Sequence, residues 1–423
     1  MPKHLPTHLA TLHAATRREA LLGSGALFAW AHVPRIASAE GRDPRFLTLV
    51  LRGALDGLAA VAPVGDPDWI KLRGDNALRL DGDTPGLPLD GFFALNPGMP
   101  NLHRLYKSGQ AIIVHAAATP YRERSHFDGQ DVLESGLGGV ARADSGWLNR
   151  ALVAMEPGGR VDPQARRTFA VGPITPLVVR GPAPVLSWVP PRGTPVSDET
   201  TMRLLDLYRH TDPTLARVLE DRIGLNAIAR AGGMERMADQ GPVVQIGPIE
   251  QVRAYFAEAA GAAGKFLASA DGPRVGALAL DGWDTHVNEG AVKGRLAALL
   301  GALDGALAAL EKSMGPAWNE TVVALVTEFG RTARVNGTEG TDHGTGTVAL
   351  LAGGALKGGR VVADWPGVKE ADLYEKRDLK ATTDLRAVPK GLLRDHLRLD
   401  DAVLAASVFP DSGAVKPVAG LVG

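Results

Sequence analysis

The 423-residue chain contains no cysteine. Disulfide bridges, thiolate nucleophiles and cysteine-ligated zinc or iron–sulfur sites are therefore excluded, and a metal could be bound only through His and carboxylate side chains. An excess of positive charge is also lacking, because 46 Lys and Arg are balanced by 47 Asp and Glu. We therefore expect no nucleic-acid partner, since such partners are attracted by a positive field.

A membrane-spanning segment is lacking as well. The apolar run from Leu21 to Val33 is shorter than the roughly 20 residues that cross a bilayer. Arg17 and Arg18 precede this run and the small residues Ala37-Ser38-Ala39 follow it, a layout typical of an export signal of the twin-arginine type. We expect residues 1–39 to be a signal peptide and the protein to be periplasmic or secreted. An amphipathic first helix with a chance arginine pair is the alternative.

The composition is that of a folded globular protein, with 45% hydrophobic and 22% charged residues. The length would allow two or three average domains, but α/β folds of this size often form one domain. We expect residues 40–423 to form a single α/β domain. Residues 157–250, which combine short apolar runs with a long helical stretch, are predicted to form an insertion or a cap.

Apolar runs of strand length alternate with amphipathic helical stretches along most of the chain. This alternation predicts a mostly parallel central sheet with helices on both faces, in which ligands bind at the carboxyl ends of the strands. The predicted strands are contained in RFLTLVLRGALDGL, QAIIVHAA, RVGALALDGWDTH, ETVVALVTEFGR and TVALLAGG.

Acidic and imidazole side chains follow several of these strands. Because ligands of a zinc-type ion converge from several elements, their position at the strand ends predicts a divalent-metal site. Zinc is expected first, with manganese or calcium as alternatives. Each residue also has a structural interpretation: a turn, a loop hydrogen bond or a buried ion pair. The predicted ligands are Asp56, Asp284, His286, Glu328, Asp342 and His343.

Ser125 lies just before a predicted short helix and could simply be its N-cap. The same position suits a nucleophile, because a helix N-terminus presents free N–H groups to an anion. Arg122, Arg124 and Arg331 could then bind the remaining anionic oxygens. Thr119 is the alternative nucleophile. A small anionic ester is the substrate that these residues predict.

Seven motifs together resemble a bacterial family known as domain of unknown function 1501. Members of that family carry twin-arginine signals and are grouped with the alkaline phosphatase and sulfatase superfamily. The motifs cover nearly the whole chain and are LRGALDGL, PYRERSHFDGQD, SGWLNRAL, WDTH, TEFGRT, GTDHGTG and KGGRVVADWPG.

The resemblance implies an alkaline-phosphatase-like three-layer sandwich with a two-metal site that hydrolyses or transfers phosphate or sulfate esters. By this resemblance Asp56 looks like the first-strand ligand of one metal, and Ser125 occupies the region of the nucleophile. Asp284 and His286 look like the ligand pair of the other metal, and His343 is similar to the last histidine ligand.

The sequence departs from the superfamily pattern at Glu328-Phe329, where an Asp-His pair is usual. Phenylalanine cannot bind a metal, so one metal site lacks a ligand unless Asp342 or His126 replaces it.

From the export signal, the predicted ligands and the family resemblance together, we expect an exported metal-dependent hydrolase of phosphate or sulfate esters. The alternatives are a binding or scaffolding protein of the cell envelope that has lost turnover, and a cofactor-free enzyme acting on carbohydrate.

Overall fold

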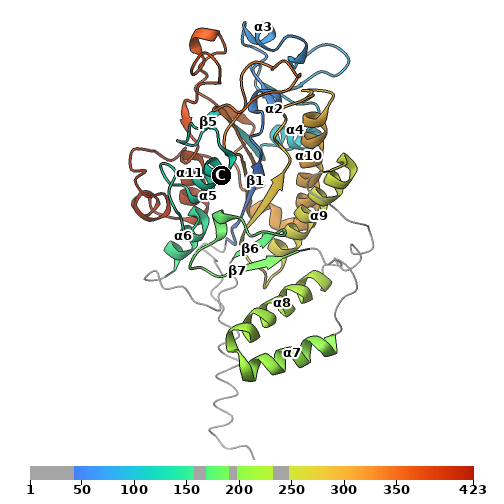
Figure 1. The fold of residues 1–423 in the computed structure, drawn as a ribbon, viewed down its shortest axis with the longest axis vertical. Helices are drawn as coiled ribbons and strands as arrows, with labels where there is room; N and C mark the ends of the chain where they lie inside the picture. Colours follow the sequence, from blue (N-terminus) through green and yellow to red (C-terminus); the bar gives the residue numbers. More distant parts are fainter. Residues whose placement is uncertain (1–41, 157–167, 190–197, 232–246) are drawn as a thin grey trace, which may run out of the picture. The chain divides into compact units, whose positions relative to one another are not determined.

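The structure is a computed structural model, which describes residues 42–156, 168–189, 198–231 and 247–423 (Figure 1). The expected signal peptide, residues 1–39, lies outside the described residues. Within these residues, no helix combines the length and the apolar character needed to span a bilayer.

A central sheet of nine strands runs through the described part of the chain. All neighbouring strands are parallel except β10, which is antiparallel to β5 and to β9. This confirms the predicted mostly parallel sheet. The order is β11 (Arg360–Val362), β5 (Ala111–Ala118), β10 (Thr347–Ala352), β9 (Thr321–Val326), β1 (Arg45–Arg52), β8 (Val275–Asp281), β6 (Thr168–Val171) and β7 (Val185–Trp188), with β12 (Thr383–Asp384) paired to β5.

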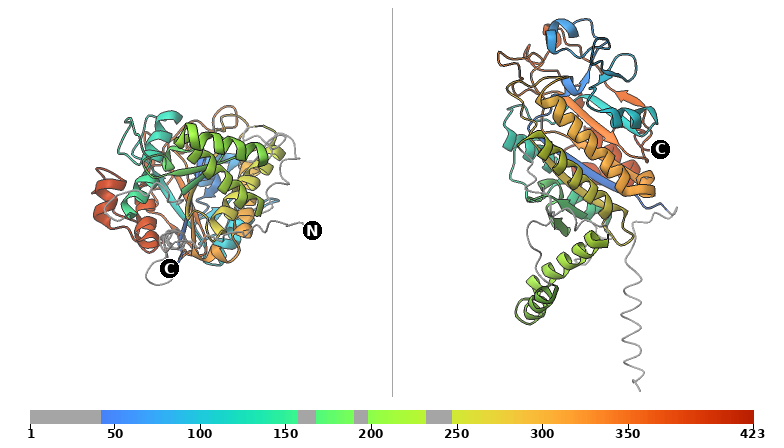
Figure 2. Two further views of the ribbon diagram at one scale, coloured as in Figure 1. Left: turned by 90° about the horizontal axis from the view of Figure 1, so that it is seen from below. Right: turned by 90° about the vertical axis from the view of Figure 1, so that its right-hand side faces the viewer.

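Helices cover both faces of this sheet, which confirms the three-layer arrangement (Figures 1 and 2). Leu47 and Leu49 of β1 belong to the core on one face, and Phe46 and Val50 belong to the core on the other. This alternation follows from the period of two in a strand and explains why β1 is apolar along its length. The first face is covered by α4 (Pro100–Lys107), α9 (Ile249–Ala268) and α10 (Arg295–Met314), and the second by α5 (His126–Ser135), α6 (Trp147–Met155) and α11 (Ala387–Leu397).

The smaller elements lie in the connections. In the predicted insertion at 157–250, β6 and β7 extend the central sheet, while α7 (Asp198–Thr211) packs on α8 (Pro213–Ala231). A three-stranded sheet is formed by β2 (Val61–Ala62), β4 (Ala94–Leu95) and β3 (Leu87–Pro88). The other short helices are α2 (Gly57–Ala60), α3 (Trp69–Arg73), η1 (Gly74–Asn76), η3 (Leu177–Val179), η5 (Gly315–Glu320), η6 (Glu370–Asp372), α12 (Asp401–Val403) and η7 (Leu404–Val408).

The sheet brings five connecting segments to one edge. The carboxyl ends of β8, β1 and β9 are neighbours, because Arg52 pairs with Asp281 and Val50 with Val326. β5 runs in the same direction, so the segment after it emerges at that edge as well. The reversed strand β10 starts there, and the glycine-rich segment 336–346 that precedes it therefore lies at the same edge.

Candidate metal centre

The side chains of His126, His286 and His343 meet around the carboxylate of Asp284. Nε2 of His126 lies 3.4 Å from Oδ2 of Asp284, and Nε2 of His343 lies 3.2 Å from Oδ1. Nε2 of His286 lies 3.0 Å from the same Oδ1 and 3.0 Å from Nε2 of His343. In His126, Asp284 and His343, the candidate ligand atoms all lie within 4.8 Å of one another.

These distances fit a bound divalent ion. A tetrahedral ion with bonds of 2.0 to 2.1 Å places neighbouring ligand atoms about 3.3 Å apart. Nδ1 of His343 is 2.9 Å from the carbonyl oxygen of Arg124, to which it donates, so a metal-binding ring would direct the lone pair of Nε2 into the cluster. Nε2 of His126 is buried and has no hydrogen-bond partner. A cation at the centre would satisfy that nitrogen.

Glu328 holds His126 in this orientation. Its Oε1 lies 2.8 Å from Nδ1 of His126, and it also accepts hydrogen bonds from Gly53 N at 2.8 Å and from Nε2 of Gln130 at 3.2 Å. The Glu328 side chain is fully buried. A carboxylate on the far nitrogen of a histidine fixes the tautomer and makes the near nitrogen a better metal ligand. Glu328 is therefore placed to support a ligand rather than to act as one.

The electrostatics of the cluster favour a negative carboxylate among positively charged groups. Although burial opposes ionisation, the contacts with His126, His343 and Arg331 hold the pKa of Asp284 well below its usual range. The contacts with Asp284 and Glu328 raise the pKa of His126 to about 9. Since a metal ligand must be deprotonated, binding an ion here would release the proton from His126.

Close backbone approaches fix the ligand-bearing segments. Gly53, which follows β1, has a φ of 118°, and a Cβ on this residue would lie 2.6 Å from the backbone nitrogen of Asp284. A Cβ on Gly340 would lie 2.1 Å from the carbonyl oxygen of His286. Because both distances are far below any van der Waals contact, only glycine allows these segments to pack so closely.

Phe329, at the position where the superfamily pattern has a histidine, is buried against the cluster. Its ring stacks on His126 with a centroid distance of 5.1 Å and an interplanar angle of 24°. It is tilted against His343 at a centroid distance of 5.4 Å. Phe329 thus supplies no ligand, and His126 lies in the cluster beside it.

Asp56 does not take part in this cluster. Its carboxylate forms a buried ion pair with Arg73, with distances of 2.7 Å from Nη1 to Oδ2 and 3.1 Å from Nη2 to Oδ1. Oδ1 also accepts hydrogen bonds from the backbone nitrogens of Leu58 and Ala59 and so caps α2. Both oxygens are occupied within the fold, which agrees with the structural interpretation of Asp56.

Arg331 and Arg124 are also engaged in internal contacts. Nη1 of Arg331 lies 2.6 Å from Oδ1 of Asp284, so the buried guanidinium holds this carboxylate. Arg124 forms ion pairs with Asp378 and Glu375. The structure therefore places Arg331 as a support of Asp284 and directs the Arg124 guanidinium to a neighbouring loop.

Asp342 and the half-buried Arg122 lie at the periphery of the cluster. Oδ1 of Asp342 is 3.4 Å from Nδ1 of His286 and thus contacts the outer nitrogen of that ring. Arg122 donates to the carbonyl oxygens of Thr119 and Tyr121.

Of the two candidate nucleophiles, Ser125 has the freer hydroxyl. It occupies the N-cap position of α5 and directly precedes His126, but its side chain makes no capping hydrogen bond. Thr119 is buried, and its hydroxyl donates to the carbonyl oxygen of Glu328 at 3.2 Å.

Asp284, His286 and His343 were predicted from the sequence as ligands, and the structure brings them together. His126 was predicted only as a replacement ligand. A signal for His126 was present, because His126 and Gln130 are spaced i and i+4 on one helix face. Both side chains contact Glu328.

Fold and site together define an α/β protein with a histidine–carboxylate centre at the carboxyl edge of a mostly parallel sheet. The chain belongs to the family described as protein of unknown function (DUF1501), whose model matches residues 113–408. No curated protein matches the sequence.

Several solved structures overlap this fold in part. The phosphonate monoester hydrolase of Agrobacterium radiobacter is 12% identical, with a TM-score of 0.35, over 88% of this chain and 78% of that one. The C-terminal periplasmic domain of EcEptC from Escherichia coli, in complex with Zn, is 13% identical with a TM-score of 0.30 over 74% of each chain. The alkaline phosphatase of the Antarctic bacterium TAB5 is 10% identical with a TM-score of 0.32, over 75% and 94%.

Proposed function

We propose that the protein is a metal-dependent hydrolase of small phosphate or sulfate esters. The observation that carries this proposal is the convergence of three imidazole Nε2 atoms on the carboxylate of Asp284, together with the unsatisfied Nε2 of His126. His126, Asp284 and His343 would hold the ion, and His286 lies within reach as a further ligand. A divalent ion held there supplies Lewis acidity toward an anionic oxygen of the substrate.

Ser125 is the proposed nucleophile. The first turn of α5 presents N–H groups without helical partners, and these can donate to the anionic oxygens of the ester. Ser125 Oγ attacks the phosphorus or sulfur atom, the bond to the alcohol breaks, and the serine proton passes in net terms to the departing alcohol. Water then cleaves the serine ester, which releases inorganic phosphate or sulfate and restores the hydroxyl.

The experiment that tests this proposal combines metal analysis with turnover. The purified protein should carry about one equivalent of zinc or another divalent ion and should hydrolyse an aryl phosphate or an aryl sulfate. Asp284→Asn combined with His343→Ala should lose both the metal and the turnover. If the double variant keeps both, the proposed centre is wrong.

A second candidate is an envelope binding or scaffolding protein that binds the ion without turnover. The internal ion pairs of Arg124 and Arg331 favour it, because these guanidinium groups are not directed at a substrate anion. A protein that retains zinc but hydrolyses neither ester would support this candidate.

We also propose export by the twin-arginine route, based on Arg17, Arg18 and the small residues 37–39. Replacing both arginines by lysine should leave the protein inside the cell, as fractionation with an antibody would detect. Unchanged export of this variant would contradict the proposal.

A further inference from the structure

Glu289 is a buried carboxylic acid outside the metal cluster, and it contacts both of the segments that supply ligands. Its Oε1 accepts a hydrogen bond from Thr285 Oγ1 at 3.0 Å, and its Oε2 accepts one from Thr341 Oγ1 at 2.8 Å. Thr285 lies between the ligand candidates Asp284 and His286. One side chain therefore joins the segment after β8 to the segment before β10.

We infer that Glu289 is a positioning residue that clamps the two ligand segments together and so sets the geometry of the metal centre. The inference rests on the proposed metal centre and adds to it a residue that touches no ligand directly. Backbone pairing supports the same junction, because Thr341 N donates to the carbonyl oxygen of Thr285 and Glu289 N donates to that of Glu339.

The clamp reaches Asp284 through Arg331. Nε of Arg331 donates to Thr341 Oγ1 at 3.1 Å, while Nη1 of the same guanidinium holds Asp284 Oδ1. Since the threonine oxygen accepts from Arg331, its own proton is directed toward Glu289. The hydrogen bonds thus form one path from Glu289 through Thr341 and Arg331 to the central carboxylate.

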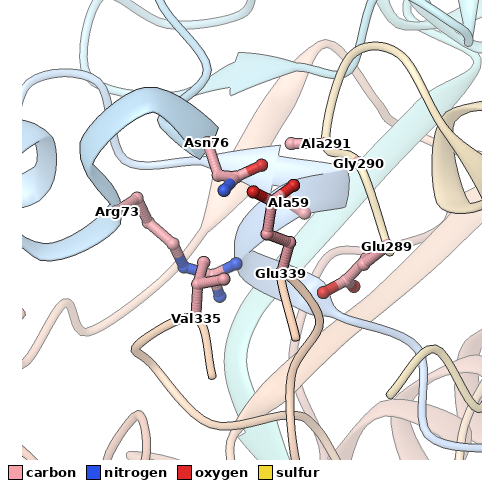
Figure 3. Close-up of a pocket in the computed structure, with 8 residues that line it drawn as sticks. All are labelled: Ala59, Arg73, Asn76, Glu289, Gly290, Ala291, Val335 and Glu339. Carbon is pink, nitrogen blue, oxygen red and sulfur yellow. The ribbon is translucent and has the colours of Figure 1, made fainter. Parts of the chain in front are cut away.

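The surroundings of Glu289 explain how a carboxyl group can be buried there. Its side chain and that of Arg73 point toward one another across a hollow that is also lined by Asn76 and Glu339 (Figure 3). Arg73 is already paired with Asp56. Burial and the nearby Asp56 carboxylate raise the pKa of Glu289 to about 8. A neutral acid at this place needs no further cation, and both of its oxygens can still accept hydrogen bonds.

Four variants test the inference: Glu289→Ala, Glu289→Gln, Thr341→Val and, as a control, Thr48→Val. Thr48 lies in β1, and its buried hydroxyl has no hydrogen-bond partner, so its loss should change nothing at the centre. Glutamine keeps the shape of a neutral acid, with one acceptor and one donor. Thr341→Val removes the clamp from its other end and preserves the volume of the side chain.

Two measurements on the full chain compare these variants with the wild type. Competition with a chromophoric chelator measures zinc affinity, and the visible spectrum of the Co²⁺-loaded protein reports ligand geometry. We expect Glu289→Ala and Thr341→Val to weaken zinc binding about tenfold or more and to alter the Co²⁺ spectrum. Glu289→Gln should retain most of the affinity, and Thr48→Val should match the wild type.

Hydrogen exchange in the metal-free protein separates this inference from the proposed function. Peptides covering residues 283–290 and 338–343 should exchange faster in Glu289→Ala than in the wild type or in Thr48→Val. If the wild type binds no metal, the proposed centre is wrong, and the exchange rates alone decide whether Glu289 is a clamp. Wild-type exchange in Glu289→Ala, or wild-type zinc affinity in both Glu289→Ala and Thr341→Val, would overturn the inference.

Discussion

Nδ1 of His126 and Oε1 of Glu328 lie 2.8 Å apart, which joins the segment after β5 to the segment after β9. The two residues are 202 positions apart in the sequence. The carboxylate fixes the imidazole so that its other nitrogen faces Asp284. This contact makes Glu328 an orienting group for a ligand candidate, and its consequences can be measured.

Replacing Glu328 by glutamine should weaken zinc binding by about 10- to 100-fold, because the amide no longer provides a negative partner for the His126 ring. The chelator competition described above measures this loss. Asp304→Asn is a matched control, since Asp304 is a buried carboxylate that instead binds the N-terminus of α4. Equal affinities in Glu328→Gln and the wild type would show that Glu328 does not tune the centre.

Asp56→Asn should destabilise the fold but leave the metal in place. Removing one partner of the buried pair with Arg73 should lower the free energy of unfolding by about 3 kcal/mol. Urea unfolding of the metal-free protein measures this loss, and elemental analysis gives the zinc content. The comparison variant Asp284→Asn should show the reverse effect on the metal, losing the zinc that Asp56→Asn retains. If the Asp56→Asn protein folds but contains no zinc, Asp56 is a metal ligand and the structural interpretation is wrong.

His115 should make the fold less stable in mild acid. Its ring is fully buried, with Nε2 at 2.8 Å from the carbonyl oxygen of Val61 and Nδ1 accepting from Ala116 N. Burial lowers the pKa of His115 from 6.5 to about 4. As the pH falls from 6.5 toward 4, the unfolded chain takes up a proton that the folded protein cannot, so stability falls.

The contribution of His115 should be about 1.4 kcal/mol per pH unit in this window and should be absent above it. His115→Gln removes the titrating ring while keeping a donor for the Val61 carbonyl. Urea unfolding at several pH values should therefore give a flatter acid slope for the variant than for the wild type. Identical slopes would mean that the buried ring does not titrate as its surroundings predict.

Ser125→Ala should abolish ester hydrolysis and leave zinc binding unchanged, because the proposed ligands are the side chains of His126, Asp284 and His343. Thr119→Val serves as the comparison and should retain turnover. Steady-state hydrolysis of an aryl phosphate and zinc content are the two readouts. If Thr119→Val loses turnover while Ser125→Ala keeps full activity, Thr119 is the nucleophile and Ser125 is not.

Much of the fold could be predicted from the sequence. The runs that form β1, β5, β8, β9 and β10 are apolar over strand length, and such runs occur where both faces of a strand are buried. The reversed direction of β10 had no signal in its own residues, since an apolar strand looks the same in either direction. Only its pairing with β5 and β9 gave its direction.

The roles of the site residues could be predicted only in part. Asp284 and His286 follow a strand that ends at this edge, and His343 precedes a strand that starts there. The topology therefore predicted that these side chains would lie close together. A carboxylate after a strand, however, looks the same in sequence whether it faces a metal, as Asp284 does, or an arginine, as Asp56 does. The choice depends on which cation reaches it, and Arg73 reaches Asp56 from 17 positions along the chain.

The sequence by itself determined the chemistry that is available: without cysteine, only imidazole and carboxylate groups could form a metal centre, and the apolar runs required a sheet covered on both faces. The tertiary structure alone decided which of these groups share the centre. In the folded protein Glu328 contacts the outer nitrogen of His126, and Glu289 accepts hydrogen bonds from both Thr285 and Thr341. The physical reason is that hydrogen bonds act over about 3 Å, and contacts of that precision between distant segments exist only after the strands have paired.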